Sequence, residues 1–240
     1  MTFTVYALCW NEMFLLPHFF KHYEWADRIV IYDNESDDGS QEFIKKQKNA
    51  ELRIYKTNWQ DNLSMIKIKN TCWKGDRSDF VVVCDMDEFL IDHEKAVPYA
   101  GIYTGSTQRD GKADQVVFDC LWWEMVAEEV PEDFKSITMK FNPTRLGSKA
   151  LCFNPRIEAI NYQPGAHLCR PVPNNRIAGV LSYNHYSALA EDYFVKRWSR
   201  YRSRTSDRDK KYGYGHHYFF SDDKIRELYK EKLCLARLNS

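Results

Sequence analysis

The first 85 residues alternate between short apolar runs and segments with helical spacing, and this alternation constrains the fold more than any other feature. The apolar runs are rich in β-branched residues and are typical of buried strands. Strands and helices are predicted to alternate in the order 3–9, 12–25, 28–32, 40–48, 52–56, 62–74 and 80–84. A β-α-β-α-β-α-β order favours a mainly parallel sheet with helices on both faces.

The second half of the chain is less regular. Strands are predicted over 115–124 and 179–183, and helices over 190–204 and 222–238. The glycine-containing segment 213–217 between the two helices is expected to be a mobile loop. Because the 240 residues contain no clear linker, repeat or low-complexity segment, we expect a single α/β domain.

Three carboxylates directly follow the strand predicted at 80–84: Asp85, Asp87 and Glu88. Successive side chains of an extended chain alternate, so Asp85 and Asp87 should point the same way. Two like charges placed so repel unless a cation lies between them. Mg²⁺ and Mn²⁺ suit such oxygen ligands, and a substrate diphosphate would complete their coordination. The alternative is a solvated acidic turn, in which Glu88 only holds the turn.

Other polar residues are expected at the same edge of the sheet. Ligands of open α/β sheets bind outside the carboxyl ends of the strands. Asp33 follows the second strand, and Asn11 and Glu12 follow the first. The chain has no Gly-x-Gly-x-x-Gly or Walker-type loop to cradle phosphates. A metal ion on the carboxylates is the natural substitute.

Composition argues against several other classes of protein. The net charge is zero, so no global field favours nucleic acid. No apolar run approaches the ~18 residues of a transmembrane segment. The first nine residues lack the basic start of a signal peptide and fit a strand. The seven cysteines include no Cys-x-x-Cys pair, which indicates reduced thiols, no zinc site and a cytoplasmic location.

Four elements together resemble the nucleotide-sugar-dependent glycosyltransferases of GT-A fold, in the family-2-like group that includes family 92. The first is the predicted opening helix with Asn11, Glu12, His22 and Tyr23. The others, in chain order, are Tyr32-Asp33-Asn34-Glu35-Ser36-Asp37-Asp38-Gly39-Ser40, Asp85-Met86-Asp87-Glu88-Phe89-Leu90, and Asn184-His185-Tyr186 before a helix with Lys196. A weaker match is Ser148-Lys149 followed by His167.

The resemblance implies a Rossmann-like GT-A fold, with a nucleotide-binding half at 1–110 and an acceptor-binding half with the C-terminal helices at 111–240. It implies inverting transfer of a sugar from a nucleoside-diphosphate sugar, with UDP expected, to a glycan or other hydroxyl acceptor. The implied cofactor is Mn²⁺ or Mg²⁺, held by Asp85, Asp87 and His185, with His167 as the competitor of His185. The implied nucleotide contacts are Leu8, Asn11, Glu12, Asp33, Asp85 and Met86.

Two roles in this scheme keep an alternative. A base must take the proton of the acceptor hydroxyl, and the candidates are Asp119 and Glu124, on the strand after the acidic motif. Each could instead be an ordinary solvent-facing carboxylate. Asp33 could likewise be a turn-capping residue. The residues at 121–124 and 187–189 depart from the family pattern where acceptor specificity would be set, so the acceptor is not carried over.

The segment 196–211 is strongly basic and contains interleaved aromatic residues. Three interpretations are open: a solvated helix face, a basic lid that contacts the diphosphate, or a surface that docks on anionic lipid.

Two other functional classes compete with the transferase. A phosphohydrolase of the haloacid-dehalogenase type would use Asp85 as its nucleophile. Its motif normally lies near the N-terminus and continues with Thr or Val, where this chain has Phe89. The third class is a non-catalytic nucleotide- or glycan-binding module of a larger enzyme.

Overall fold

The computed structural model describes residues 1–57, 59–101, 115–143 and 148–239. The strands are β1 (Phe3–Cys9), β2 (Arg28–Asp33), β3 (Ala50–Ile54), β4 (Phe80–Asp85), β5 (Glu88–Ile91), β6 (Val117–Ala127), β7 (Lys140–Phe141), β8 (Ser148–Phe153) and β9 (Arg176–Leu189). The α-helices are α1 (Leu16–His22), α2 (Ser40–Lys45), α3 (Asn62–Thr71), α4 (Val97–Gly101), α5 (Glu191–Arg204), α6 (Asp207–Tyr212) and α7 (Asp222–Leu238). Short 3₁₀ helices are η1 (His93–Ala96), η2 (Phe134–Ser136) and η3 (His216–Phe219).

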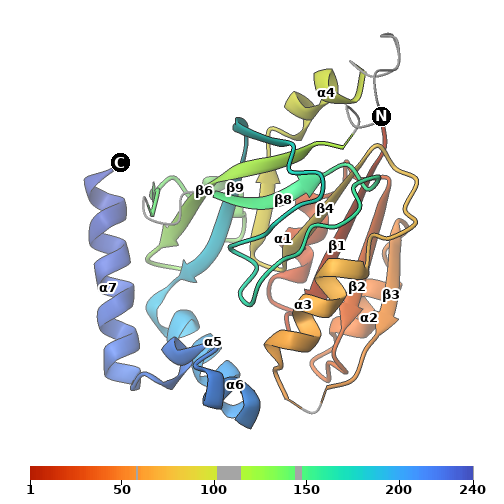
Figure 1. Cartoon of the computed structure of the whole chain (residues 1–240). Coiled ribbons are helices and arrows are strands. Elements are labelled where there is room, and N and C mark those ends of the chain that lie inside the picture. The colour runs from red at the N-terminus through yellow and green to blue at the C-terminus, as the bar shows by residue number, and fades with distance from the viewer. Residues whose placement is uncertain (58, 102–114, 144–147, 240) are drawn as a thin grey trace.

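The described strands form one sheet in the order β3-β2-β1-β4-β8-β6-β9-β5, with β7 paired to β6 (Figure 1). Strands β1 to β4 run parallel, as predicted. The second half adds β8 antiparallel to β4 and β6, a parallel pair of β6 and β9, and β5 antiparallel to β9. Since helices cover both faces, the predicted α/β class with a mainly parallel sheet is confirmed.

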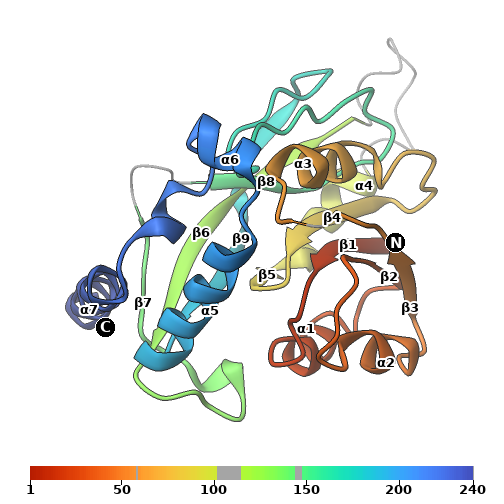
Figure 2. The same cartoon turned by 90° about the horizontal axis from the view of Figure 1, so that it is seen from below.

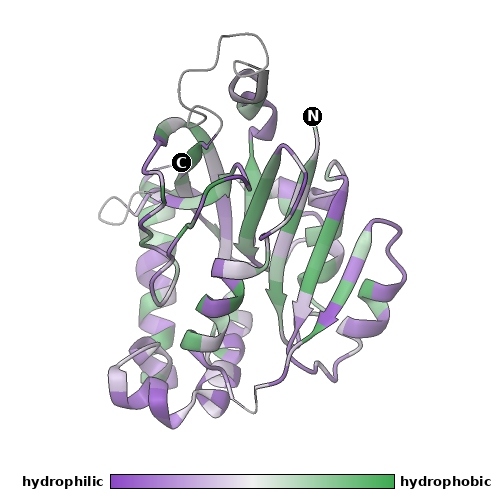
Figure 3. Ribbon diagram, turned by 45° about the vertical axis from the view of Figure 1, so that its right-hand side comes forward, coloured by the Kyte–Doolittle hydropathy of each residue, from purple (hydrophilic) through white to green (hydrophobic). Residues whose placement is uncertain are grey.

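Alternate side chains of the parallel strands enter two different cores. Val5 and Ala7 of β1 join a cluster with Phe19 of α1. Tyr6 points the other way and packs with Trp73, which follows α3. Figure 2 shows α1 and α2 on one side of the sheet and α3 on the other. The strands are accordingly the most hydrophobic part of the chain in Figure 3, because both of their faces are buried.

A third, smaller core fixes the last helices. Phe194 of α5 and Tyr229 of α7 pack with Val126 of β6 and Ala188 of β9. The hydroxyl of Tyr229 also donates to the backbone carbonyl of Ala127 at 2.7 Å. These contacts hold α5 and α7 beside the ends of β6 and β9, at the edge of the sheet where β1 and β4 end.

Strand register brings the polar strand ends together. Leu8 of β1 pairs with Asp85 of β4. His185 of β9 lies opposite Glu88 of β5 on one side and opposite Glu124 of β6 on the other. The backbone therefore places four titratable residues from four strands at one edge of the sheet.

The helix predicted at 12–25 is shorter, since α1 spans Leu16–His22. Before it, the chain makes a turn in which the N–H of Leu15 donates to the carbonyl of Glu12 at 2.9 Å. Pro17 lies in the first turn of the helix, where its missing N–H has no intrahelical partner to lose.

Other boundaries shift by a few residues. The helices predicted at 40–48 and 62–74 end earlier, at Lys45 and Thr71. The strand predicted at 52–56 spans Ala50–Ile54. Its pairing with β2, a long-range contact, decides its start.

The prediction of a short strand at 179–183, with His185 in a connection to the next helix, is wrong. Strand β9 spans Arg176–Leu189 and includes His185. The strand continues because its backbone pairs with β5 and β6 at once, opposite Glu88 and Glu124. His185 is therefore fixed by two neighbouring strands.

Helix α6 was not predicted, although its boundary signals are present. The side chain of Ser206 caps its first turn. Gly213 ends it with a φ of +72°. The segment predicted as a mobile loop, 213–217, thus contains the end of α6 and the start of η3, and its mobility stays a prediction.

The cysteines form no disulfide. All seven are free, and five of them are buried, with Cys169 partly exposed and Cys234 exposed. This agrees with the expected free thiols, while the cytoplasmic location stays a prediction. No helix in the described part of the chain is both long and apolar enough to cross a membrane.

Candidate active site

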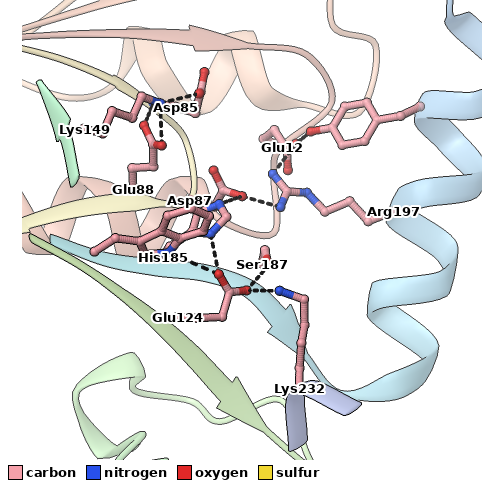
Figure 4. Close-up of polar contacts among 12 residues, drawn as sticks. Glu12, Asp85, Asp87, Glu88, Glu124, Lys149, His185, Ser187, Arg197 and Lys232 are labelled. Atoms are coloured by element: carbon pink, nitrogen blue, oxygen red, sulfur yellow. Dashed lines mark hydrogen bonds and ion pairs between the residues drawn. The ribbon is translucent and has the colours of Figure 1, made fainter. Parts of the chain in front are cut away.

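A cavity of about 610 Å³ lies at the carboxyl ends of β1 and β4, bounded by β6, β9 and residues of α5 and α7. Predicted site residues that line it are Leu8, Glu12, Asp85, Met86, Asp87, Glu124 and His185. Predicted site residues that do not are Asn11, Asp33 and Asp119. Figure 4 shows how the charged members of the first group converge.

Asp85 ends β4 between two buried lysines. Nζ of Lys69 lies 2.6 Å from Asp85 Oδ1, and Nζ of Lys149 lies 3.2 Å from Oδ2. Glu88 accepts from Lys149 at 2.5 Å and from the backbone N–H of Asp85 at 2.8 Å, so Glu88 holds the turn. Burial opposes the ionisation of Asp85, but the two lysines hold its pKa below the usual value.

Asp87 is buried in the turn between β4 and β5. Its Oδ2 accepts from Arg197 Nη1 at 2.6 Å and lies 3.3 Å from Nε2 of His185. The backbone carbonyl of Asp87 accepts from the N–H of Tyr186 at 2.8 Å. Although burial opposes its charge, Arg197 and His185 hold the pKa of Asp87 well below the usual value. Asp87 is therefore a fixed, ionised carboxylate.

Glu124 is fully buried and receives four side-chain donors. Its Oε2 lies 3.2 Å from Nε1 of Trp122 and 2.8 Å from Nδ1 of His185. Its Oε1 accepts from Nζ of Lys232 at 2.9 Å and from the hydroxyl of Ser187. The alternation of β6 and β9 explains the gathering, because residues two apart share a face.

His185 connects the two carboxylates Glu124 and Asp87 (Figure 4). Burial alone would lower the pKa of His185, but Glu124 and Asp87 raise it to about 10. Burial disfavours the charge of Glu124, yet Lys232 and His185 lower the pKa of Glu124 to about 2. The arrangement is a line of alternating charges from Lys232 to Asp87, with an imidazolium in the middle.

The basic segment 196–211 turns several of its arginines inward. Glu12, buried beside the cavity, lies 3.3 Å from Arg197 Nη2 and 3.0 Å from Arg200 Nη2, and accepts from the hydroxyl of Tyr201 at 2.6 Å. Arg204 donates to a backbone carbonyl of the facing loop at 2.9 Å. These contacts fit the interpretation of the segment as a basic cover of the cavity better than a solvated helix face.

Asp33 and Asn11 hold turns beside the cavity. Asp33 accepts from the N–H and hydroxyl of Ser36 at 2.8 and 2.5 Å, and from Gln41 at 2.9 Å. Asn11 exchanges two hydrogen bonds with Asp37, at 2.7 and 2.9 Å. These bonds match the turn-capping alternative, and the predicted nucleotide contacts of both residues stay predictions.

Asp119 faces a second, smaller cavity of about 210 Å³. Its carboxylate pairs with Arg176, whose guanidinium also donates to the carbonyl of Cys169 at 2.7 Å. Asp119 and Glu124 lie five residues apart on β6, so the alternation of side chains places them on opposite faces of the strand. The main cavity thus contains Glu124 and not Asp119.

His167, the competitor of His185, lines both cavities. Its ring stacks on Trp122 with centroids 5.6 Å apart and planes at 17°. Burial, and then the charge of Lys149, lower the pKa of His167 to about 4. It is a neutral aromatic wall of the cavity.

The residues that the sequence did not single out are cations that pair with the carboxylates of the cavity. Lys69, Arg197 and Lys232 come from three helices, and Arg197 is separated from Asp87 by 110 residues. Lys69 and Lys232 lie on helices, and a lysine is usually solvated. The only signal for Arg197 was the density of basic residues around it.

The donor set suits a divalent cation in part. The described residues contain no group of three or more His, Cys, Asp or Glu side chains placed to hold a metal ion, and the set of Asp85, Asp87 and His185 stays a prediction. Asp87 and His185 would fit as a pair once Nε2 of His185 has given up its proton, with Glu124 orienting the ring through Nδ1 as carboxylates orient histidine ligands. Mg²⁺ and Mn²⁺ accept one or two such ligands when phosphates and water complete the shell.

No protein-family model matches the sequence, and no curated protein sequence matches it. Among solved structures, residues 1–349 of S. aureus TarS are similar, with a TM-score of 0.51 and 12% identity over 85% of this chain. A longer S. aureus TarS structure gives a TM-score of 0.50 at 12% identity, and a complex of the 1–349 fragment with UDP gives 0.49. The chain spans 65% of the shorter TarS chain and 39% of the longer one.

At 12% identity, the similarity shows a shared fold. The predicted Rossmann-like GT-A fold is thereby confirmed, and membership of the family-2-like or family-92-like group stays a prediction.

Proposed function

We propose that this chain is a metal-dependent glycosyltransferase that moves a sugar from a nucleoside-diphosphate sugar, with UDP as the expected carrier, to a glycan or other hydroxyl acceptor. The observation that carries the proposal is the meeting of the acidic turn at 85–88 with buried cations around one cavity at the carboxyl edge of the sheet. Ligands of open α/β sheets bind at this edge. A volume of about 610 Å³ falls within the range of small-molecule sites, roughly 300–1,000 Å³.

The cations of the cavity suit a diphosphate. Lys69, Lys149, Arg197 and Lys232 all line it. Charged donors make the strongest hydrogen bonds to phosphate oxygens. Each of these cations is already paired with a carboxylate, so the protein holds them in position before a ligand arrives.

Asp87 and His185 would hold the divalent cation together with diphosphate oxygens. When bound, the cation would act as a Lewis acid that stabilises the charge on the departing diphosphate. Glu124 fixes the ring of His185, and Ser187 and Lys232 fix Glu124. Four donors on one buried carboxylate leave little capacity for a proton, so we assign Glu124 to positioning His185 rather than to the base.

Asp85 has a different role in this proposal. Lys69 and Lys149 lock its carboxylate, while 34% of the side chain stays exposed. A fixed, partly exposed carboxylate is suited to accept hydrogen bonds from the ribose hydroxyls. Trp10 and Tyr55 line the same part of the cavity and offer aromatic surface for the base. Inversion at the sugar follows from the resemblance and is part of the proposal.

The test is a calorimetric titration of UDP into metal-stripped protein, repeated with Mn²⁺, with GDP, CDP and dTDP as competitors. We expect binding of one nucleotide that requires the metal and is lost in Asp87→Asn. The matched control is Asp192→Asn, whose side chain is 93% exposed and lies on the outer side of α5; it should bind as the wild type does.

Absence of binding by every nucleotide, with and without metal, would contradict the proposal. Hydrolysis of a chromogenic phosphate ester, lost in Asp85→Asn, would then favour the phosphohydrolase. Metal-dependent nucleotide binding without release of UDP from any donor sugar would favour the non-catalytic module.

A further inference from the structure

The nearest cation partner of Asp87 comes from a distant helix. Its side chain is 8% exposed and accepts from Arg197 at 2.6 Å. A buried carboxylate that loses its cation is strongly destabilised. Asp87 therefore needs a positive charge whether or not a ligand is bound, and in the protein alone Arg197 and the imidazolium of His185 supply it.

Arg197 contacts two carboxylates and keeps one donor without a partner in the described part of the chain. Its guanidinium reaches across from α5 to both Asp87 and Glu12, at 2.6 and 3.3 Å. Glu12 has two further donors, Arg200 and the hydroxyl of Tyr201, at 3.0 and 2.6 Å. It would therefore stay paired if Arg197 left. The buried Nε of Arg197 has no hydrogen-bond partner among the described residues, so the guanidinium is not fully satisfied where it is.

We propose that Arg197 is an exchangeable counter-ion of Asp87. It pairs with Asp87 in the free protein and yields that carboxylate to the divalent cation when the donor binds. Its guanidinium then pairs with the diphosphate. This inference rests on the proposed function and adds the coupling between metal and nucleotide.

Two physical arguments support the exchange. A guanidinium and a divalent cation compete for the same carboxylate, and Asp87 Oδ2 already faces both Arg197 and His185. The planar fork of an arginine matches phosphate oxygens as well as it matches a carboxylate. A diphosphate in the cavity would thus draw Arg197 away and free Asp87 for the metal. Because coupling between two ligands is reciprocal, each should strengthen the binding of the other.

The experiment measures free Mn²⁺ by electron paramagnetic resonance, in titrations with and without saturating UDP. The proteins are the wild type, Arg197→Gln, Arg197→Lys, and Arg226→Gln as control. Arg226 pairs with Glu191 and Asp192 outside the cavity. Circular dichroism and thermal melts with and without Mn²⁺ establish that each variant is folded.

In the wild type, Mn²⁺ alone should bind weakly and UDP should strengthen its binding. Arg197→Gln should bind Mn²⁺ alone about tenfold more tightly than the wild type, the lower end of the effects seen when partners of metal ligands change. UDP should then increase its affinity for Mn²⁺ only slightly. Arg197→Lys keeps a positive charge but loses the planar guanidinium, so Mn²⁺ alone should still bind weakly. UDP should increase the affinity for Mn²⁺ less than it does in the wild type. Arg226→Gln should match the wild type.

The inference is overturned if Arg197→Gln is folded and binds Mn²⁺ no more tightly than the wild type, while wild-type UDP binding requires Mn²⁺. In that case the proposed function stands and only the exchange fails. A wild type that binds no nucleotide with any metal overturns both. If Arg197→Gln folds only with Mn²⁺ present, the ion has replaced Arg197 and the exchange is supported. If Arg197→Gln does not fold at all, Arg197→Lys decides the question. The exchange is overturned if UDP increases the Mn²⁺ affinity of Arg197→Lys as much as that of the wild type.

Discussion

The two halves of the molecule supply opposite charges to the cavity. The parallel half supplies the carboxylates of Glu12, Asp85, Asp87 and Glu88. The second half supplies the cations Lys149, His185, Arg197 and Lys232. Lys69 and Glu124 are the exceptions: Lys69 pairs with Asp85 inside the first half, and Glu124 pairs with His185 and Lys232 inside the second.

The halves differ in how their charges are encoded. The acidic turn is a contiguous sequence at the end of one strand, so local sequence places it. Its counter-charges in the second half, Lys149, His185 and Arg197, contact the turn only after the chain folds, over separations as long as the 110 residues between Arg197 and Asp87. The site is therefore recognisable from one half and completed by the other.

Removing a cation from the second half should have the largest effect on stability. Lys149→Met would leave Glu88 buried without its partner, because the side chains of the pair are 1% and 3% exposed. Breaking a buried pair typically costs about 3–5 kcal/mol, which urea unfolding would measure. Lys56→Met, at an exposed surface pair, is the control and should change little. A loss below about 1 kcal/mol, the usual worth of a surface pair, would show that the halves are not joined by this contact.

Removing the central charge of the acidic half should have the largest effect on activity. Asp87→Asn should reduce release of UDP from the donor about 100- to 1,000-fold, the range for losing one strong electrostatic stabiliser of the transition state. Folding should be retained, because an amide still accepts from Arg197. Turnover within a few-fold of the wild type would separate Asp87 from the chemistry.

The two carboxylates of β6 provide a matched pair. Glu124→Gln should weaken Mn²⁺ binding in the presence of UDP about 10- to 100-fold, as expected for a residue that orients a metal ligand. Asp119→Asn should leave both Mn²⁺ binding and turnover near those of the wild type, since Asp119 faces the second cavity. A large loss of turnover in Asp119→Asn, with Mn²⁺ binding intact, would instead identify Asp119 as the base.

The smallest predicted effect is a dependence of stability on pH. His22 of α1 donates from Nε2 to the carbonyl of Leu90 at 2.7 Å, and burial lowers the pKa of His22 to about 4. The unfolded chain, with a histidine pKa near 6.5, binds more protons than the folded protein between these values. Stability is therefore complete above pH 6.5 and falls as the pH drops toward 4.

Between pH 7.5 and 5 the contribution of His22 should fall by on the order of 1–2 kcal/mol. His22→Gln, which does not titrate, should have a shallower dependence in denaturant unfolding measured at each pH. His167 and His217 lie in the second half, and burial also lowers their pKa values to about 4. Because of them, the stability of His22→Gln should still depend on pH to some extent. Identical slopes for variant and wild type would remove His22 from this account.

The fold of the first half was predictable because its signals are local. Each apolar run there became a strand of the parallel sheet, and the shifts in 40–48 and 52–56 are of a few residues. In the second half, β9 was predicted too short, because its length is set by pairing with β5 and β6. Helix α6 was missed although Ser206 and Gly213 mark its ends.

The candidate site, like the fold, could be predicted in part from the sequence. The convergence of Asp85, Asp87, Glu124 and His185 on one cavity agrees with the sequence patterns and the resemblance. The spacing of five residues predicts that Asp119 and Glu124 face opposite ways, but only the packing of the whole sheet shows that Glu124 faces the main cavity. Arg197 could not be selected from the basic residues around it, because its role depends on which side of α5 meets Glu12.

The most direct test of the account is a crystal structure of the protein with UDP and Mn²⁺, in which anomalous scattering locates the ion. The account predicts UDP in the main cavity, the ion in contact with Asp87 and His185, and the Arg197 guanidinium on the diphosphate. An ion bound away from Asp87, or UDP outside this cavity, would contradict it.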